Sequence, residues 1–270
     1  MMTTSLPLGR PAGLPAWARR VLSGGVLLAL VLMIGCSGGP GGRTNASFVL
    51  QVDMTSQTNR AQLLAQTIKV LRERLSRTGV VRLALRAEGE ERIAIDLKGV
   101  PAAEDKTVRR LLVRPGLLEF RTVHPQSVDL IANKGSAPGF EPLPMKVSAR
   151  AATNVLVYLV SEQPARGLTG RHVDRAWLFR DRGSGRPTIG LRFSPPGASL
   201  YSEVTRENVG RRLAIVLDRE VLAAPEIEEP QTVPHCTIPM RLLDREVNEV
   251  LNLLQHPLPA RVKIAEEGSP

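Results

Sequence analysis

The chain has 270 residues, 43% of them hydrophobic, which is enough for one large domain or two modest domains with real cores. Only 3% are aromatic, so the core must consist of Leu, Val, Ile and Ala, and platforms that stack nucleic-acid bases are not expected. The formal charge is +10, but the arginines are scattered among acids without a run of five or six. This distribution argues against nucleic acid as a partner. It fits either a solvated surface or attraction to anionic headgroups or unfolded polypeptides.

Residues 1–35 have the layout of a secretory signal. Arg10, Arg19 and Arg20 precede an unbroken apolar run over residues 26–34, and no acidic residue occurs in this segment. The flanking residues do not support a twin-arginine signal at Arg19-Arg20. As a helix the apolar run extends about 14 Å, whereas a bilayer core of about 30 Å needs about 20 residues. The run is therefore expected to be a signal that is removed and not a membrane span.

The apolar run ends in Met33-Ile34-Gly35-Cys36, a small residue followed by a cysteine. This resembles the lipobox of bacterial lipoproteins, in which the cysteine is lipidated and becomes the new N-terminus, so Cys36 is the expected lipidation site. An ordinary cleaved signal with an incidental cysteine is the alternative. Without the signal, 235 residues remain with a formal charge of +7. Residues 36–46 are rich in glycine and are expected to form a tether.

Residues 47–123 predict the strand and helix order of a ferredoxin-like βαββαβ unit within an α+β fold. The stretch FVLQVDM reads as a strand, and Gly79 ends a helix whose apolar residues recur at helical spacing: Leu64, Ile68, Leu71 and Leu75. Two alternating runs, 82–87 and 92–97, predict a hairpin across a Gly89 turn. A second helix from Pro101 to Pro115-Gly116 precedes the strand LLEFRTV, which is expected to complete the unit.

Residues 124–150 contain four prolines and are expected to form an irregular connection. Residues 151–267 then predict a mixed, mainly antiparallel domain. Its expected strands are 154–161, 171–181, 188–194, 212–218 and 221–227, and its expected helices lie over 197–208 and around Val247, Leu251 and Leu254. The last strand, ARVKIAE, either stays in this domain or returns to the first one.

The stretch GASLYSEVTRENVGRRLAIVLDREVLAAPEI closely resembles the P1 region of the SecD and SecDF subunits of the bacterial protein-export machinery. The residues that carry this pattern are Gly197, Ala198, Tyr201, Thr205, Asn208, Gly210, Leu213, Ala214, Ile215, Leu217, Asp218, Ala224 and Pro225. Upstream, LRERLSRTGV, ERIAIDLKGV and LLEFRTV look like the family's first periplasmic half, and LTG at 168–170 matches the segment that opens its head subdomain. Downstream, LPARVKIAEE looks like the exit. The resemblance covers nearly all of residues 47–267 and implies a base and a head.

The chain also departs from the family pattern. Of the family's Asp-Leu-x-Gly-Gly signature only the acid remains, as Asp53. The glycines expected after the Ala-Pro strand are replaced in EEPQTVPHCTIPM by Pro230, Pro234 and Pro239, so we expect a loop that is built differently. The family's transmembrane bundle, with its proton-coupling charges, has no counterpart in this sequence. A lipid on Cys36 would then replace the membrane helix that normally precedes the domain.

The resemblance implies a non-catalytic, lipid-anchored module of the cell envelope that faces the periplasm. Its expected partners are unfolded exported polypeptides or Sec translocase subunits, and the membrane through the lipid on Cys36. The alternative is a structural or assembly protein of the envelope that reuses the fold without a role in export, because fold does not fix function. Ser37 does not resemble the aspartate that retains some lipoproteins at the inner membrane, which leaves open the membrane that holds the lipid.

Catalysis has little support in the residues. The four histidines, His124, His172, His235 and His256, lie far apart, and none begins a metal-ligand spacing. Gly183-Ser184-Gly185 lacks the lysine of a phosphate-binding loop. Adjacent residues of a strand point to opposite faces, so His235 cannot activate Cys236 there. Glu226, Glu228 and Glu229 could form an acid–base pair, but they fit a solvated strand end, and Asp218 fits a turn. We expect no enzyme activity, cofactor, metal or small-molecule substrate.

Overall fold

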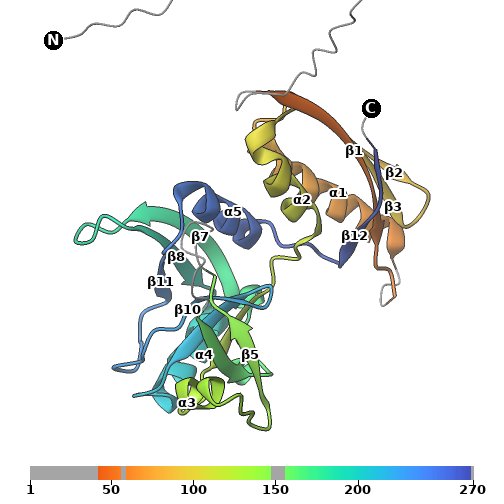
Figure 1. The fold of residues 1–270 in the computed structure, drawn as a ribbon. Helices are drawn as coiled ribbons and strands as arrows, with labels where there is room; N and C mark the ends of the chain where they lie inside the picture. The colour runs from red at the N-terminus through yellow and green to blue at the C-terminus, as the bar shows by residue number, and fades with distance from the viewer. Residues whose placement is uncertain (1–41, 56–58, 147–155, 269–270) are drawn as a thin grey trace, which may run out of the picture. The chain divides into compact units, whose positions relative to one another are not determined.

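The structure is a computed structural model, which describes residues 42–55, 59–146 and 156–268 (Figure 1). We call residues 42–115 and 257–268 the base, and residues 116–256 the head. The predicted signal and Cys36 lie outside the described residues. No helix in the described part of the chain combines the length and apolar character that a membrane crossing requires.

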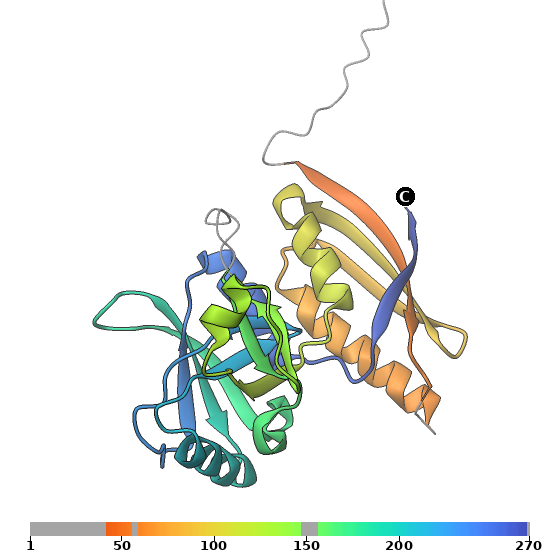
Figure 2. The ribbon, with the colours of Figure 1, turned by 60° about the horizontal axis from the view of Figure 1, so that its bottom comes forward.

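The base is one antiparallel sheet covered by two helices. Its strands are β1 (Arg43–Val52), β2 (Arg82–Glu88), β3 (Arg92–Pro101) and β12 (Val262–Gly268), in the order β12-β1-β3-β2. Both helices, α1 (Arg60–Ser76) and α2 (Asp105–Val113), lie on the same face of this sheet in the two views, and a short 3-10 turn (Ala102–Glu104) precedes α2 (Figures 1 and 2).

Alternation along β1 explains the packing of the base. Ala46, Phe48, Leu50 and Val52 are buried and face the helices, whereas the residues between them are half-buried. Helix α1 begins where the Asn59 side chain accepts a hydrogen bond from the Gln62 amide at 3.1 Å. The apolar stripe predicted for residues 59–78 is buried on the side of α1 that packs on the sheet.

The structure corrects the predicted last strand of the base. The stretch LLEFRTV contains β4 (Leu118–Thr122), which pairs with a strand of the head and not with the base sheet. The fourth base strand is β12, which returns from the C-terminal end and pairs with β1 from Ser47↔Gly268 to Val52↔Val262. Both stretches are short and apolar, so only the tertiary context decides which one joins the sheet.

The predicted tether is also corrected. Strand β1 already begins at Arg43 and pairs there with Pro101, so residues 43–46 of the expected tether belong to the base sheet. The remaining tether residues up to 41 lie outside the described residues.

The described residues of the head form three small antiparallel sheets. The first has the order β10-β9-β4, with β9 (Leu213–Leu217) and β10 (Glu220–Ala223); the second has the order β11-β8-β7, with β7 (Val173–Arg180), β8 (Pro187–Phe193) and β11 (His235–Pro239); the third pairs β5 (Phe140–Pro144) with β6 (Val157–Ser161). The head helices are α3 (Ser127–Ala132), α4 (Pro195–Glu207) and α5 (Asp244–Gln255), with 3-10 turns at Ala165–Gly167 and Gly170–His172.

Two head strands lie in stretches that we expected to be irregular. Within residues 124–150 the chain forms α3 and β5, and β11 lies in the expected loop EEPQTVPHCTIPM. Both strands carry prolines, Pro142 and Pro144 in β5 and Pro239 in β11. Proline is tolerated on edge strands because its missing amide is not needed there, so proline content alone misled the prediction.

The main head core lies between the first two sheets and helices α4 and α5. All five residues of β9 are buried, and they lie within the strand predicted over residues 212–218. The aromatic residues meet in this core: the ring centroids of Phe193 and Tyr201 are 4.7 Å apart, and those of Phe120 and Phe193 are 5.5 Å apart. Such contacts add about 0.5–1.5 kcal/mol per pair beyond the burial of area.

Arg74 of α1 ties the two chain segments that connect base and head. Its side chain is fully buried and donates to the carbonyl oxygens of Leu111, Arg114 and Pro115 on the outgoing segment. Its Nε also donates to the His256 carbonyl oxygen on the returning segment at 2.7 Å. Burial lowers the pKa of this guanidinium to about 10, which still leaves it charged at neutral pH.

Candidate functional site

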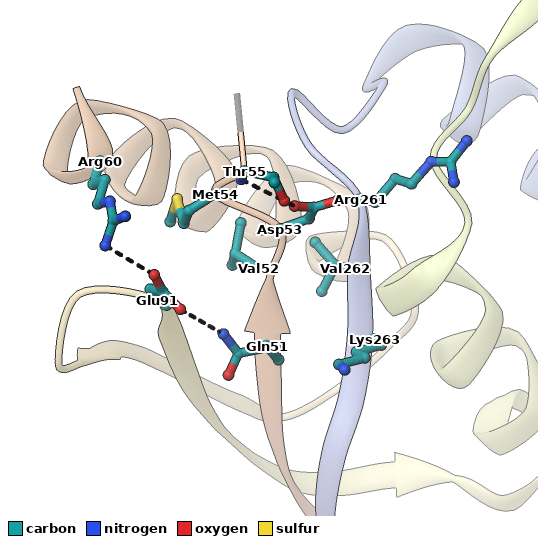
Figure 3. Close-up of a pocket in the computed structure, with 10 residues that line it drawn as sticks. All are labelled: Gln51, Val52, Asp53, Met54, Thr55, Arg60, Glu91, Arg261, Val262 and Lys263. Atoms are coloured by element: carbon teal, nitrogen blue, oxygen red, sulfur yellow. Dashed lines mark hydrogen bonds and ion pairs between the residues drawn. The ribbon is translucent and has the colours of Figure 1, made fainter. Parts of the chain in front are cut away.

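The base has a hollow of about 720 Å³ where β1 ends and β12 begins (Figure 3). It is lined by Gln51, Val52, Asp53, Met54, Thr55, Arg60, Glu91, Arg261, Val262 and Lys263. Its most notable residue is Asp53, the acid that remains of the family's signature. The hollow is therefore one candidate for a binding site.

Most polar groups of the base hollow are engaged by their neighbours. The Thr55 hydroxyl and backbone amide both donate to Asp53, and these hydrogen bonds lower the pKa of the Asp53 carboxyl. Glu91 accepts from Arg60 at 3.0 Å and from Gln51 at 3.1 Å. Figure 3 shows Arg261 pointing away from the other labelled side chains. The arrangement holds a turn and a hairpin, and its cationic groups do not converge on a common point.

A second hollow, of about 380 Å³, lies in the head, and we call it the head groove. Its floor is apolar, with Phe120, Tyr201, Leu213, Ile215 and Ile227. One wall is the segment Val233 and His235 to Thr237, and the other consists of Thr205, Pro225, Glu226, Glu228, Glu229 and Gln231.

Local hydrogen bonds fix the walls of the head groove. Helix α4 starts at Ser194, whose side chain accepts from the Gly197 amide, and Pro195 occupies its first position. At the other end of α4 the Thr205 hydroxyl accepts from the Gln231 amide at 3.0 Å. The amide of Gly210, whose φ is +75°, donates to the Ile227 carbonyl oxygen, which pins the segment after β10 beside the helix.

Tyr201 carries the most distinctive polar atom of the groove. The residue is only 9% exposed and stacks on Phe193, but its hydroxyl has no hydrogen-bond partner among the described residues. Burial, with a smaller contribution from Cys236, raises the pKa of this phenol above its ordinary value. The hydroxyl is thus a neutral group in the lining of the groove, available as donor or acceptor to an occupant.

Cys236 and His235 do not form a catalytic pair. They are consecutive residues of β11, with Cys236 half-buried toward the core and His235 exposed. Burial raises the pKa of the Cys236 thiol to about 12, so the thiol stays protonated at neutral pH. Since the thiolate is the nucleophile, Cys236 is poorly suited to covalent chemistry.

The three glutamates at the groove rim are exposed, as expected for a solvated strand end. Glu226, Glu228 and Glu229 take part in no ion pair or side-chain hydrogen bond within the described chain. Most other head carboxylates have such partners; Glu141, for example, pairs with Arg121 and Arg219. The rim therefore presents free negative charge beside an apolar floor.

Asp218 holds a turn, in agreement with its sequence interpretation. It adopts a φ of +50° between β9 and β10, and its Oδ1 accepts from the amides of Gly116 and Leu117 at 2.8 Å. Its Oδ2 accepts from Arg114 at 3.0 Å. The carboxylate fixes the entry of the chain into the head.

The structure does not bring the four histidines into one cluster. His124 follows β4, His172 ends a 3-10 turn, His235 opens β11 and His256 follows α5. In residues 42–55, 59–146 and 156–268, no group of three or more His, Cys, Asp or Glu side chains could hold a metal ion.

The wall made by β11 was not predicted from the sequence. The alternating pattern of HCTIP, bounded by Pro234 and Pro239, was the available signal for a short edge strand. Tyr201 and Thr205 were singled out only as pattern residues, because their contribution to a groove depends on the distant residues Gln231 and Cys236.

The chain is similar in sequence to proteins of known families. Residues 146–260 match the model of the SecDF P1 head subdomain. The protein translocase subunit SecDF of Thermus thermophilus is 31% identical over 220 residues, which cover 81% of this chain and 29% of that protein. The subunit SecD of Syntrophobacter fumaroxidans is 30% identical over 210 residues, which cover 76% of this chain and 38% of that protein. This chain thus spans about a third of the length of these relatives.

Two solved structures share the fold. A crystal structure of SecDF in a super-membrane-facing form has a TM-score of 0.63 and 28% identity, and the match covers 83% of this chain and 30% of that one. A structure described as that of a membrane component SecDF that enhances protein export has a TM-score of 0.59 and 27% identity. The second match covers 82% of this chain and 98% of that chain, so it includes both base and head.

Proposed function

The chain belongs to the SecD and SecDF family through its P1 region, and from this premise we propose that it is a non-catalytic module of bacterial protein export. It binds exported polypeptides, or the Sec translocase, on the periplasmic side of the membrane. The observation that carries this proposal is the match over base and head together, which covers 98% of a solved chain from a protein said to enhance export.

The head groove supports a role in contact and not in bond-making. Its floor is apolar and aromatic and includes the Tyr201 hydroxyl, which has no partner in the described chain, and its cysteine is held as a neutral thiol. A largely apolar hollow with a few convergent polar groups is typical of binding sites. The base hollow, whose polar groups engage one another, supports a scaffolding role for the base.

We also propose that lipid on Cys36 anchors the chain to the envelope. Each buried CH₂ contributes about 0.8 kcal/mol, so several acyl chains give durable anchoring where one is marginal. The test is metabolic labelling with an alkyne fatty acid, followed by membrane fractionation, of the wild type and Cys36→Ser. The variant should lose both the label and membrane association. Equal labelling of the two proteins would refute lipidation at this residue.

The test of the export role is photo-crosslinking in living cells from positions spread over residues 168–240. We expect adducts with precursors in transit or with Sec subunits. Capture of neither, with export unchanged and envelope integrity altered on deletion, would reject this role and favour the structural or assembly role.

A further inference from the structure

We propose that the head groove takes up an extended polypeptide segment as an added strand along β11, with basic side chains of that segment facing Glu226, Glu228 and Glu229. This inference rests on the proposed function and names the class of polypeptide that the head selects. It is carried by a strand edge whose outward amides are unbonded, a groove beside that edge, and rim carboxylates that form no ion pair within the described chain, although Arg212 lies opposite Glu226 in an isolated bridge.

The outward backbone groups of β11 form no hydrogen bond within the described chain, although β10 lies close to this strand. The Phe193 amide donates to the Pro234 carbonyl oxygen, and the Met240 amide donates to the Pro187 carbonyl oxygen. Hydrogen-bonded pairs alternate along an antiparallel ladder, so Cys236 and Ile238 bond to β8, and the backbone groups of His235 and Thr237 point away from it. Within the described residues, no backbone bond or isolated bridge satisfies these outward amides.

The edges of the other two three- and four-stranded sheets in the described chain are covered or charged. In the head, β10 is flanked by Met145, β4 is bridged at Glu119 by Thr169, and Val123, just after β4, is bridged by Val160. In the base, the edge strands carry charged side chains that discourage pairing: Arg82, Arg86 and Glu88 on β2, and Lys263, Glu266 and Glu267 on β12. The outward side chains of β11 are His235, Thr237 and Pro239, and none of them is an acid, lysine or arginine. This edge therefore lacks the charged side chains that guard the base edges, and Pro239 leaves His235 and Thr237 to supply its outward amides.

The head groove lies directly beside this edge. His235, Cys236 and Thr237 form one of its walls, so a strand that pairs with β11 borders the apolar floor. Side chains of a strand alternate between faces, so every second residue of the added segment can reach Tyr201 and its neighbours. The unpartnered Tyr201 hydroxyl supplies a polar contact at that depth. Main-chain bonds provide affinity without a fixed sequence, which suits a protein with many clients.

The rim adds a preference for basic segments. Glu226, Glu228 and Glu229 are exposed and unpaired within the described chain, although the protein as a whole carries a formal charge of +10. A lysine or arginine on the added segment would meet these carboxylates across the groove. Exposed ion pairs are individually weak, so the rim tunes selection and the strand edge supplies most of the affinity.

The first arm of the test measures charge selection by fluorescence anisotropy with the purified protein. The probes are a labelled twelve-residue peptide alternating valine with lysine and threonine, and a matched peptide with glutamine in place of lysine. The triple variant Glu226→Gln, Glu228→Gln, Glu229→Gln should bind the lysine peptide about tenfold more weakly and the glutamine peptide as the wild type does. A control with the same charge change elsewhere in the head, Asp129→Asn, Glu162→Gln, Asp174→Asn, should bind both peptides within twofold of the wild type.

The second arm tests the strand edge. Thr237→Pro removes one outward amide without removing a bond to β8, and should weaken both peptides at least tenfold. Thr237→Val keeps the amide and should bind as the wild type does. If Thr237→Pro fails to fold, the lysine peptide methylated on alternate backbone nitrogens, titrated against the wild type, replaces it and should lose binding.

The two arms separate this inference from the proposed function. Unchanged binding by Thr237→Pro or by the N-methylated peptide overturns strand addition, and equal weakening of the lysine and glutamine peptides by the rim variant overturns charge selection. Either result leaves the export role standing if precursors still crosslink to residues 168–240 in cells. Absence of those crosslinks, with peptide binding intact, rejects the export role and retains the strand site.

Discussion

Base and head use the same kinds of element in opposite ways. The base closes one four-stranded sheet with the two ends of the described chain, and its edge strands β2 and β12 carry charged side chains. The head divides its strands among three small sheets and leaves β11 with an open edge beside an apolar groove. A continuous sheet with guarded edges is suited to support, and a divided sheet with an open edge is suited to transient contact.

The charges follow the same division. The hydrogen bonds and ion pairs of the base hollow join Asp53 to Thr55 and Glu91 to Arg60, so its acids serve local structure. The three glutamates at the rim of the head groove serve no such purpose within the described chain. Asp53, the acid retained from the family signature, thus lies in the base hollow, whereas the groove proposed for binding lies in the head.

The largest expected effect comes from the residue that joins the two regions. Arg74→Met leaves buried carbonyl oxygens of α2 and of the α5 end without a donor, and should lower the free energy of unfolding by about 3–5 kcal/mol. Arg72→Met, on the exposed face of the same helix, should change it by less than about 0.5 kcal/mol. Urea denaturation measures both. Similar losses in the two variants would show that Arg74 does not hold the joint.

The chain entry into the head should be the next most sensitive point. Gly116 has a φ of +80°, and a Cβ there would lie 2.6 Å from the Leu253 carbonyl oxygen. Gly116→Ala should therefore destabilise the protein by about 2–4 kcal/mol, through backbone strain and the clash. Gly89→Ala, with a φ of +67° and open space around it, should destabilise it by only about 1 kcal/mol. Thermal unfolding of both variants tests this. Equal decreases in Tm would show that a Cβ at residue 116 does not clash with the Leu253 carbonyl oxygen.

A partly buried ion cluster in the head, in which Glu141 pairs with Arg121 and Arg219, predicts a contribution to stability that is lost in acid. Burial alone would raise the pKa of Glu141, but hydrogen bonds from Arg219 and Arg121 hold it below the ordinary value of 4.5. Its stabilisation is complete above pH 4.5 and is lost as the pH falls through the lower folded-state pKa. Glu141→Gln should lower the free energy of unfolding by about 1–2 kcal/mol at pH 7. In urea titrations the difference in unfolding free energy from the wild type should shrink as the pH falls below 4.5; a constant difference would contradict the assignment.

The smallest stability effect is expected at the groove itself. Tyr201→Phe removes a hydroxyl that has no hydrogen-bond partner in the described chain, so the free energy of unfolding should stay within about 0.5 kcal/mol of the wild type. Binding of the lysine peptide should weaken measurably. A large loss of stability would mean that the hydroxyl has a structural role.

Much of the fold could be predicted from the sequence where one periodicity dominates. The stripe from Leu64 to Leu75 gave α1, and the alternating runs around Gly89 gave the β2–β3 hairpin. The partner of LLEFRTV could not be predicted, because a short apolar strand fits either sheet and the choice depends on the distant strand β12. Strands β5 and β11 were not predicted because they contain prolines, which are tolerated on edge strands.

The candidate site was less accessible to prediction than the fold. Tyr201 lies on α4, Ile215 on β9 and Cys236 on β11, and no local pattern connects them. The glutamates were noticed as a charged run, but their lack of partners is a property of the folded chain. Cys36, which the lipobox resemblance singles out, lies outside the described residues and depends on the labelling test.

The most direct test of a supporting base and a contacting head is hydrogen exchange at single-amide resolution, with and without an unfolded exported precursor. The account predicts that the amides of His235 and Thr237 become protected when the precursor is added, while those on the outer edges of β2 and β12 exchange as before. Protection at the base edges with none along β11 would contradict it.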